Sequence, residues 1–94
     1  MKKITLEEAK ISMKKLNINP KIIKPSYFKK AMQVELEHGL VNKKTNVTQN
    51  NLNKTAKIAL AHLMEFPDYY IRLEKMEKQS NKYWTNKKKP NLFN

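Results

Sequence analysis

Residues 51–73, NLNKTAKIALAHLMEFPDYYIRL, contain one expected helix, the break that follows it and the start of a second helix. Apolar residues recur in this stretch at spacings of three and four, which is the period of an α-helix with one buried face. Pro67 suits the first turn of a helix, because its missing N–H needs no partner there, and Asp68 suits the positive end of the helix dipole. The stretch therefore predicts one helix over about residues 51–65 and another over about residues 67–80. The predicted buried stripes are Leu52, Ala56, Ala59, Leu63 and Phe66 for the first, and Tyr69, Leu73 and Met76 for the second.

The same period continues toward the start of the chain. A helix over about residues 26–38 would have Ser26 as its N-cap and Gly39 as a left-handed terminator, the only glycine in the sequence. A further helix over about residues 5–16 would begin at the capping box Thr5-Leu6-Glu7-Glu8. The predicted fold is therefore all-α, a small four-helix arrangement with short loops.

The chain of 94 residues is long enough for one domain with a modest core. We expect that domain to cover residues 1–80, and we expect residues 81–94, which lack helical periodicity, to form a basic aromatic tail. No apolar run is long enough to span a bilayer, and the lysine-rich start lacks the apolar segment of a secretory signal. We therefore expect a protein that is neither secreted nor bound to a membrane. The absence of cysteine excludes disulfides and thiolate metal sites.

The net charge of +12 is distributed unevenly along the chain. Residues 1–30 carry nine Lys against two Glu, and residues 81–94 carry four Lys and no acid, whereas residues 31–80 are nearly neutral. Such ends are available to a negatively charged partner, because net charge governs association more than fold. An alternative is that A/T-rich codons inflate both Lys and Asn, so that the charge reflects genome composition.

The basic ends supply the candidate residues for binding a polyanion or a protein partner. Aromatic rings among lysines can stack on bases while the lysines follow phosphates. The near absence of Arg argues against base-specific contacts, so any nucleic acid would be bound through its backbone without sequence preference. Alternatively, the tail is a frayed terminus in which Trp84 covers the end of a helix. The candidate residues are Lys2, Lys3, Lys82, Tyr83, Trp84, Lys87, Lys88 and Lys89.

A second candidate site consists of two glutamate–histidine pairs. Glu35-x-x-His38 and His62-x-x-Glu65 each place a carboxylate and an imidazole one helical turn apart on the same face. If the two helices are antiparallel neighbours, the four side chains converge and suit a single Zn²⁺ or similar ion. The alternative is that both histidines lie at the core boundary, with their ring nitrogens bonded to Glu35, Glu65 or helix-end carbonyls and with no cofactor required.

Enzymatic activity is not expected. The chain has no cysteine nucleophile, suggests no Ser-His-Asp arrangement, and has too few glycines for either glycine-rich phosphate-binding pattern. Tyr69 and Tyr70 are expected to serve in packing rather than recognition.

Two blocks of sequence are more specific than a generic helical pattern. They are MQVELEHG at residues 32–39 and TAKIALAHLMEFPDYY at residues 55–70, continuing to Leu73. Together they resemble the family called domain of unknown function 5661, small helical domains of bacteria, phages and large DNA viruses, over about residues 5–77. The resemblance implies a helical fold and a viral or bacterial setting, and it implies no catalytic activity.

These observations favour a non-enzymatic accessory or structural protein of a virus or phage particle, such as a minor capsid protein. It would bind a shell protein or nucleic-acid backbone through its basic ends, in the virion or the host cytoplasm. The alternative function is a metal- or ligand-binding helical domain that uses Glu35, His38, His62 and Glu65. Inhibition of a host enzyme is a third possibility for a chain this small.

Overall fold

The computed structural model of this protein describes residues 2–41, 43–90 and 92, and its regular structure is entirely helical over these residues. The prediction of an all-α fold is therefore confirmed. The predicted ends of the helices agree to within about two residues, except that the last helix continues well past residue 80. The elements are α1 (Leu6–Lys15), α2 (Pro25–Leu40), the short 3₁₀ helix η1 (Lys43–Thr45), α3 (Leu52–Glu65) and α4 (Tyr69–Trp84).

The two ends of α1 are defined by local hydrogen bonds. Glu8 N–H donates to Thr5 Oγ1 at 3.1 Å and Thr5 N–H donates to Glu8 Oε1 at 3.0 Å, so the predicted capping box is present. At the other end Asn17 has φ 57°, and Ile18 N–H donates to the carbonyl of Met13 at 2.8 Å. Asn17, in the left-handed conformation, therefore terminates α1.

Both predicted ends of α2 need correction. The helix begins at Pro25 with Lys24 as N-cap, so Ser26 lies inside it and makes no cap. Gly39 also lies inside the helix, which ends at Leu40, and it does not have a positive φ. A Cβ atom at Gly39 would lie 2.8 Å from Thr48 Oγ1. The glycine is thus explained by the close approach of the loop that follows α2, and not by backbone conformation.

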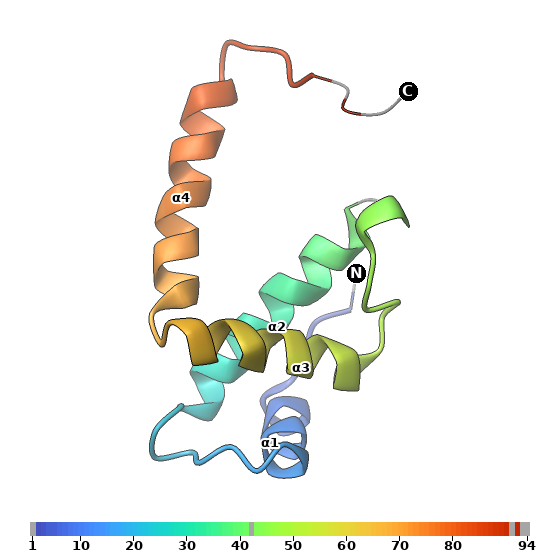
Figure 1. The fold of residues 1–94 in the computed structure, drawn as a ribbon, viewed down its shortest axis with the longest axis vertical. Helices are drawn as coiled ribbons and strands as arrows, with labels where there is room; N and C mark the ends of the chain where they lie inside the picture. The colour runs from blue at the N-terminus through green and yellow to red at the C-terminus, as the bar shows by residue number, and fades with distance from the viewer. Residues whose placement is uncertain (1, 42, 91, 93–94) are drawn as a thin grey trace.

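The core lies where α1, α2 and α3 meet. In Figure 1, α3 crosses in front of α2, and α1 lies below both. Alanines at the helix contacts, Ala31, Ala56 and Ala59, leave room for this close crossing. The three helices together are called the helical body below. Its buried apolar residues are Ala9, Met13, Phe28, Ala31, Met32, Leu36, Ala56, Ala59 and Leu63, joined by Ile4 before α1 and Tyr70 from α4.

The fourth helix leaves the helical body. Pro67 precedes α4 instead of lying in its first turn, and Asp68 is the N-cap. The helix then rises away from α2 and α3, as Figure 1 shows, and Tyr70 is its only buried residue. The predicted inward face is therefore wrong in part, because Tyr69 and Leu73 are only half-buried and Met76 is exposed.

The C-terminal half of α4 contains no buried residue, only the half-buried Trp84, and the molecule extends 42 Å along its longest axis. Within the described residues, no helix combines the length and the apolar character that crossing a membrane requires.

Candidate polyanion-binding surface and glutamate–histidine pairs

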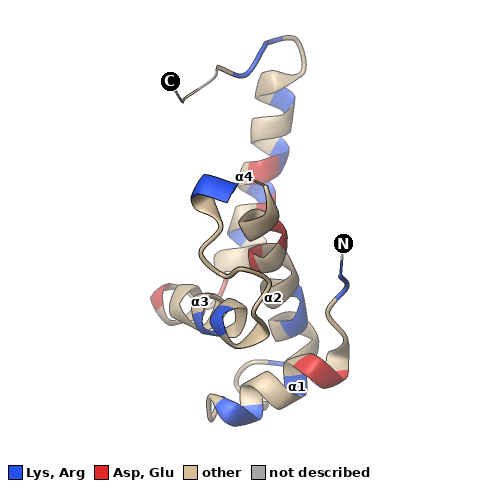
Figure 2. Cartoon of the chain, turned by 90° about the vertical axis from the view of Figure 1, so that its right-hand side faces the viewer, with Lys and Arg blue, Asp and Glu red and all other residues tan. Residues whose placement is uncertain are grey.

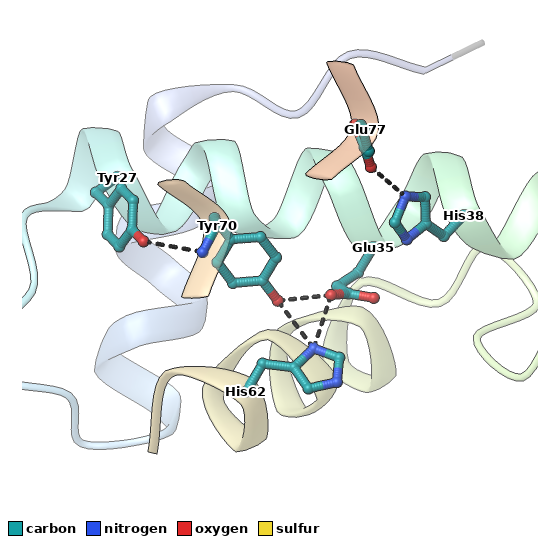
Figure 3. A network of polar contacts seen from close by, with 6 residues as sticks. All are labelled: Tyr27, Glu35, His38, His62, Tyr70 and Glu77. Carbon is teal, nitrogen blue, oxygen red and sulfur yellow. Dashed lines mark hydrogen bonds and ion pairs between the residues drawn. The ribbon is translucent and has the colours of Figure 1, made fainter. Parts of the chain in front are cut away.

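The two histidines take their carboxylate partners from different helices. Glu35 on α2 meets His62 on α3, with Oε2 and Nδ1 2.9 Å apart, whereas His38 meets Glu77 on α4, with Nε2 and Oε1 3.1 Å apart (Figure 3). Glu65 lies exposed at the last turn of α3. Among the described residues, no three His, Asp or Glu side chains gather as a group that could hold a metal ion.

The structure therefore brings together only Glu35 and His62 of the four predicted metal ligands. The predicted site required α2 and α3 to lie antiparallel, so that both Glu-x-x-His patterns faced each other. Because α3 instead crosses α2 (Figure 1), one residue of each pattern reaches the crossing point and the other points elsewhere. The boundary interpretation is correct for His62, which bonds to Glu35, and names the wrong partner for His38.

Glu35 is the centre of a buried hydrogen-bond network. Glu35 is only 7% exposed. Its Oε2 atom accepts from the Tyr70 hydroxyl at 2.6 Å and from His62 Nδ1–H at 2.9 Å. The Tyr69 ring stacks on the His62 ring, with centroids 4.3 Å apart. A buried carboxylate is tolerable because these donors replace water. The network ties α2, α3 and the start of α4 together.

A second tyrosine completes the attachment of α4. The Tyr27 hydroxyl on α2 donates to the carbonyl of Pro67 at 3.0 Å and accepts from Tyr70 N–H at 3.3 Å. These bonds satisfy backbone groups at the turn between α3 and α4, where helix geometry leaves them without partners. The first turn of α4 is therefore fixed on the helical body.

Burial and the hydrogen bond to Glu35 raise the pKa of the Tyr70 hydroxyl well above its ordinary value. Burial also raises the pKa of Tyr69, and the negative charge of Glu35 raises it further. Tyr70 therefore remains a proton donor to Glu35 at neutral pH. Sequence reasoning treated both tyrosines as packing residues and placed Tyr69 on the buried stripe, whereas the structure buries Tyr70 and leaves Tyr69 half-buried. That choice is made by the direction in which α4 leaves α3.

Exposed ion pairs also link α4 to α2. Lys30 Nζ lies 2.9 Å from Glu74 Oε2, and this contact lowers the pKa of Glu74. The side chains of His38 and Glu77 are each about half exposed to solvent. Exposed pairs of this kind contribute little stability. Beyond Tyr70, α4 is thus only weakly attached to the helical body.

The N-terminal candidates are only partly available for a partner. Lys2 Nζ lies 3.0 Å from Glu8 Oε2. The pKa of Glu8 is lowered mainly by the hydrogen bond from Thr5 N–H and further by Lys2. Lys3 is exposed. The first turn of α1 therefore already neutralises one of the two lysines predicted to bind.

The C-terminal candidates lie differently from the prediction. Lys82, Tyr83 and Trp84 form the last turn of α4, so the predicted tail over residues 81–94 is corrected to a segment that starts after Thr85, the C-cap. A helix that is already nucleated gains a backbone hydrogen bond for each added residue, so it continues without a buried face. The apolar stripe of the sequence ends near residue 80, so it does not indicate that the helix continues to Trp84.

We call Lys82, Tyr83, Trp84, Lys87, Lys88 and Lys89 the basic tip. The Tyr83 and Trp84 rings lie edge to face with centroids 4.8 Å apart, and Lys87 Nζ lies 3.8 Å from the centre of the Tyr83 ring. In Figure 2 the acidic residues lie along the helices, and at the C-terminal end of α4 and in the segment after it the only charged residues are lysines. The lysines of the tip form no ion pair with any described residue. The tip therefore presents uncompensated positive charge beside the exposed Tyr83 ring and the half-buried Trp84 ring.

The family model for DUF5661, described as a protein of unknown function, matches residues 3–79. The chain therefore belongs to this family, as the resemblance predicted. No curated protein and no solved structure matches the chain. The matched range ends within α4, before the basic tip.

Proposed function

We propose that this protein is a non-enzymatic accessory module that binds nucleic-acid backbone without sequence preference. The observation that carries the proposal is the basic tip, whose lysines lack ion-pair partners among the described residues and one of which, Lys87, lies over the Tyr83 ring. Lysines that neutralise phosphates release counterions, and this release supplies most of the affinity in non-specific binding. Rings of the tip add stacking on unpaired bases.

The single arginine supports backbone binding over base-specific binding. Arg72 is the residue type that best forms a two-pronged contact with guanine, but its guanidinium carbon lies 4.1 Å from the centre of the Phe66 ring. The remaining cations are lysines, which act as point charges and follow phosphates of any sequence.

The setting that we propose is a virus or phage particle or the host cytoplasm, where the module would accompany packaged nucleic acid. Contact of the same basic tip with an acidic shell protein is the other form of this proposal. Purified particles that contain the chain at a defined copy number would support either form, and nucleic-acid binding in solution separates them.

The metal-binding alternative has less support. Glu35 and His62 already hydrogen-bond to each other, and His38 lies with Glu77 across a different pair of helices. A chelator is expected to leave the melting temperature unchanged. A lowered melting temperature together with near-stoichiometric metal in the purified protein would instead favour a metal site.

The salt dependence of binding tests the proposal. If about six phosphates are contacted on a duplex, a plot of log affinity against log salt concentration should have a slope near −5. Two duplexes of scrambled sequence should bind equally. A slope near zero would reject nucleic-acid binding.

A charge-matched pair of variants locates the contact. Replacing the four lysines of the basic tip with Gln should make the slope less negative by about 3 to 4 and leave the melting temperature unchanged. The control replaces Lys10, Lys21, Lys24 and Lys29 with Gln, which removes the same charge from elsewhere. Equal effects of the two variants would mean that net charge alone, and not the tip, determines the affinity.

A further inference from the structure

A small hollow lies between α1 and α3, away from the basic tip. Its volume is about 220 Å³. Each helix contributes residues at positions i, i+3 and i+4, which lie on one helical face. Four of its residues carry hydrogen-bond donors, while Leu16 and Ala56 provide an apolar wall. The lining residues are Ser12, Lys15, Leu16, Asn53, Ala56 and Lys57.

Ser12 is the unusual member of this lining. The residue is only 5% exposed, yet its hydroxyl makes no hydrogen bond with any described residue. No completely buried side-chain nitrogen or oxygen in the described part of the chain lacks a partner, so this hydroxyl must reach solvent. The hollow is the opening that Ser12 lines. A nearly buried polar group with no protein partner indicates a place for water or a ligand.

The charge of the hollow selects the ligand. Lys15 and Lys57 are exposed and form no ion pair with any described residue. The acids of α1 are in its first turn, and the acid of α3, Glu65, is its last residue. Two ammonium groups, a carboxamide and a hydroxyl therefore surround the hollow with donors and no carboxylate. This chemistry suits a compact anion with several oxygens.

A neighbouring hollow shows that lysines alone do not create this environment. It has a volume of about 410 Å³ and also has two lysines, Lys10 and Lys14, at its rim. Its remaining lining is mostly apolar, including Met13 and Ile18, and it has no buried, unpartnered polar side chain among the described residues. A substitution at Lys14 therefore serves as one half of a charge-matched control.

We infer that the hollow between α1 and α3 binds a phosphate group of a nucleic-acid backbone. Lys15 and Lys57 contact the non-bridging oxygens, and Ser12 and Asn53 donate to the same group. The adjoining sugar lies against Leu16 and Ala56. The identity of the polymer rests on the proposed function, but the site is separate from the basic tip. Figures 1 and 2 show α1 and the C-terminal end of α4 at opposite ends of the molecule.

The test compares two double variants on the same two helices. Lys15→Gln with Lys57→Gln should weaken binding of a 20-nucleotide oligo(dT) about tenfold at fixed low salt. The control, Lys14→Gln with Lys54→Gln, removes the same charge outside the hollow and should weaken binding about threefold or less. Equal losses would overturn the hollow and leave the proposed function standing.

Removal of a hydroxyl tests the hollow without changing charge. Ser12→Ala should weaken oligo(dT) binding about threefold, whereas Ser26→Ala, which removes an exposed hydroxyl from α2, should leave it unchanged. No difference between these two variants, in proteins with unchanged melting temperatures, would contradict the role of Ser12. If Ser12→Ala fails to fold, the exposed lysine variants still decide the question.

Inorganic phosphate separates this inference from the proposed function. In NMR titrations with phosphate, the side-chain amide of Asn53 should shift and saturate in the wild type but not in the Lys15→Gln, Lys57→Gln variant. If the wild type binds neither oligo(dT) nor a duplex, the nucleic-acid form of the proposed function and the assigned polymer fail. A saturating Asn53 shift would then retain the hollow as a phosphate site, and no shift would overturn it.

Discussion

The helical body and α4 share the same helical period but differ in what they bury. Residues such as Phe28 and Met32 are completely buried where α1, α2 and α3 meet, whereas α4 buries only Tyr70. Burial stabilises the helical body, while α4 beyond its first turn relies on its own backbone hydrogen bonds, exposed ion pairs and the partly buried Leu73. A helix so weakly attached can carry charge outward without affecting the core.

The two glutamate–histidine pairs repeat this difference in polar contacts. Glu35 and His62 meet in a buried network with Tyr70, whereas His38 and Glu77 meet in solvent at nearly the same separation. Similar geometry therefore has different energetic consequences, because only the buried pair leaves an unsatisfied group when it is broken. The contrast between the helical body and α4 can be tested with matched substitutions.

The largest difference in the free energy of unfolding is expected between alanine substitutions of two methionines. Met32 is completely buried and Met76 is 58% exposed. Met32→Ala should lower the free energy of unfolding by about 2 to 5 kcal/mol, because it creates a cavity. Met76→Ala should change it by less than about 0.5 kcal/mol. Urea denaturation measures both, and similar losses would mean that α4 packs on the body in solution.

The second-largest difference in the free energy of unfolding is expected between alanine substitutions of the two histidines. His62→Ala should cost about 1 to 3 kcal/mol, because Glu35 loses a donor in a buried site. His38→Ala should cost less than about 1 kcal/mol, since its pair is exposed. Thermal or urea denaturation of the two variants checks the difference, and the reverse order would place the buried network at His38.

High pH should weaken the attachment of α4. Below about pH 10 Tyr70 is protonated in both the folded and the unfolded chain, so its contribution is complete. Above that pH the unfolded tyrosine ionises while the folded one, whose pKa is raised, does not, so stability falls by about 1 kcal/mol for each pH unit. Tyr70→Phe should make the stability less dependent on pH in this range. In absorbance titrations of the folded proteins, wild type and Tyr70→Phe should show the same amount of ionised tyrosine near pH 10, and a larger amount in the wild type would contradict the buried network.

The smallest effect concerns Gly39. Alanine inside a helix normally stabilises it by up to about 1 kcal/mol, but here the new Cβ would lie 2.8 Å from Thr48 Oγ1. Thr48 is buried, so it cannot move freely, and Gly39→Ala should cost about 1 kcal/mol instead. The same substitution in a Thr48→Ala background should be neutral or stabilising. Stabilisation by Gly39→Ala alone would show that the loop does not pack on the helix.

The four helices were predictable because their signals are local. The spacing of Ala56, Ala59 and Leu63 marks a buried face, and the capping box at Thr5 fixes where α1 begins. The buried stripes were predicted less well, since the chain leaves Phe66 exposed once α3 ends at Glu65. Period alone shows that a face is apolar and does not show whether another element covers it.

The candidate sites depended on how the helices cross, and the sequence does not contain that information locally. Glu35 and His38 lie one turn apart as predicted, but the crossing of α2 and α3 sends them to different partners. Gly39 was assigned to a helix end because the loop packed against it lies several residues later in the chain. The hollow at Ser12 was missed for the same reason, since Lys57 reaches it from another helix.

Hydrogen exchange with and without oligo(dT) tests the central claim most directly. In the free protein, amides of α2 and α3 should exchange slowly, and amides over residues 77–84 should exchange fast, because that half of α4 contains no buried residue. Added oligo(dT) should slow exchange at residues 77–84. Slow exchange there in the free protein, or protection by oligo(dT) confined to the buried helices, would contradict the division between a packed body and a binding arm.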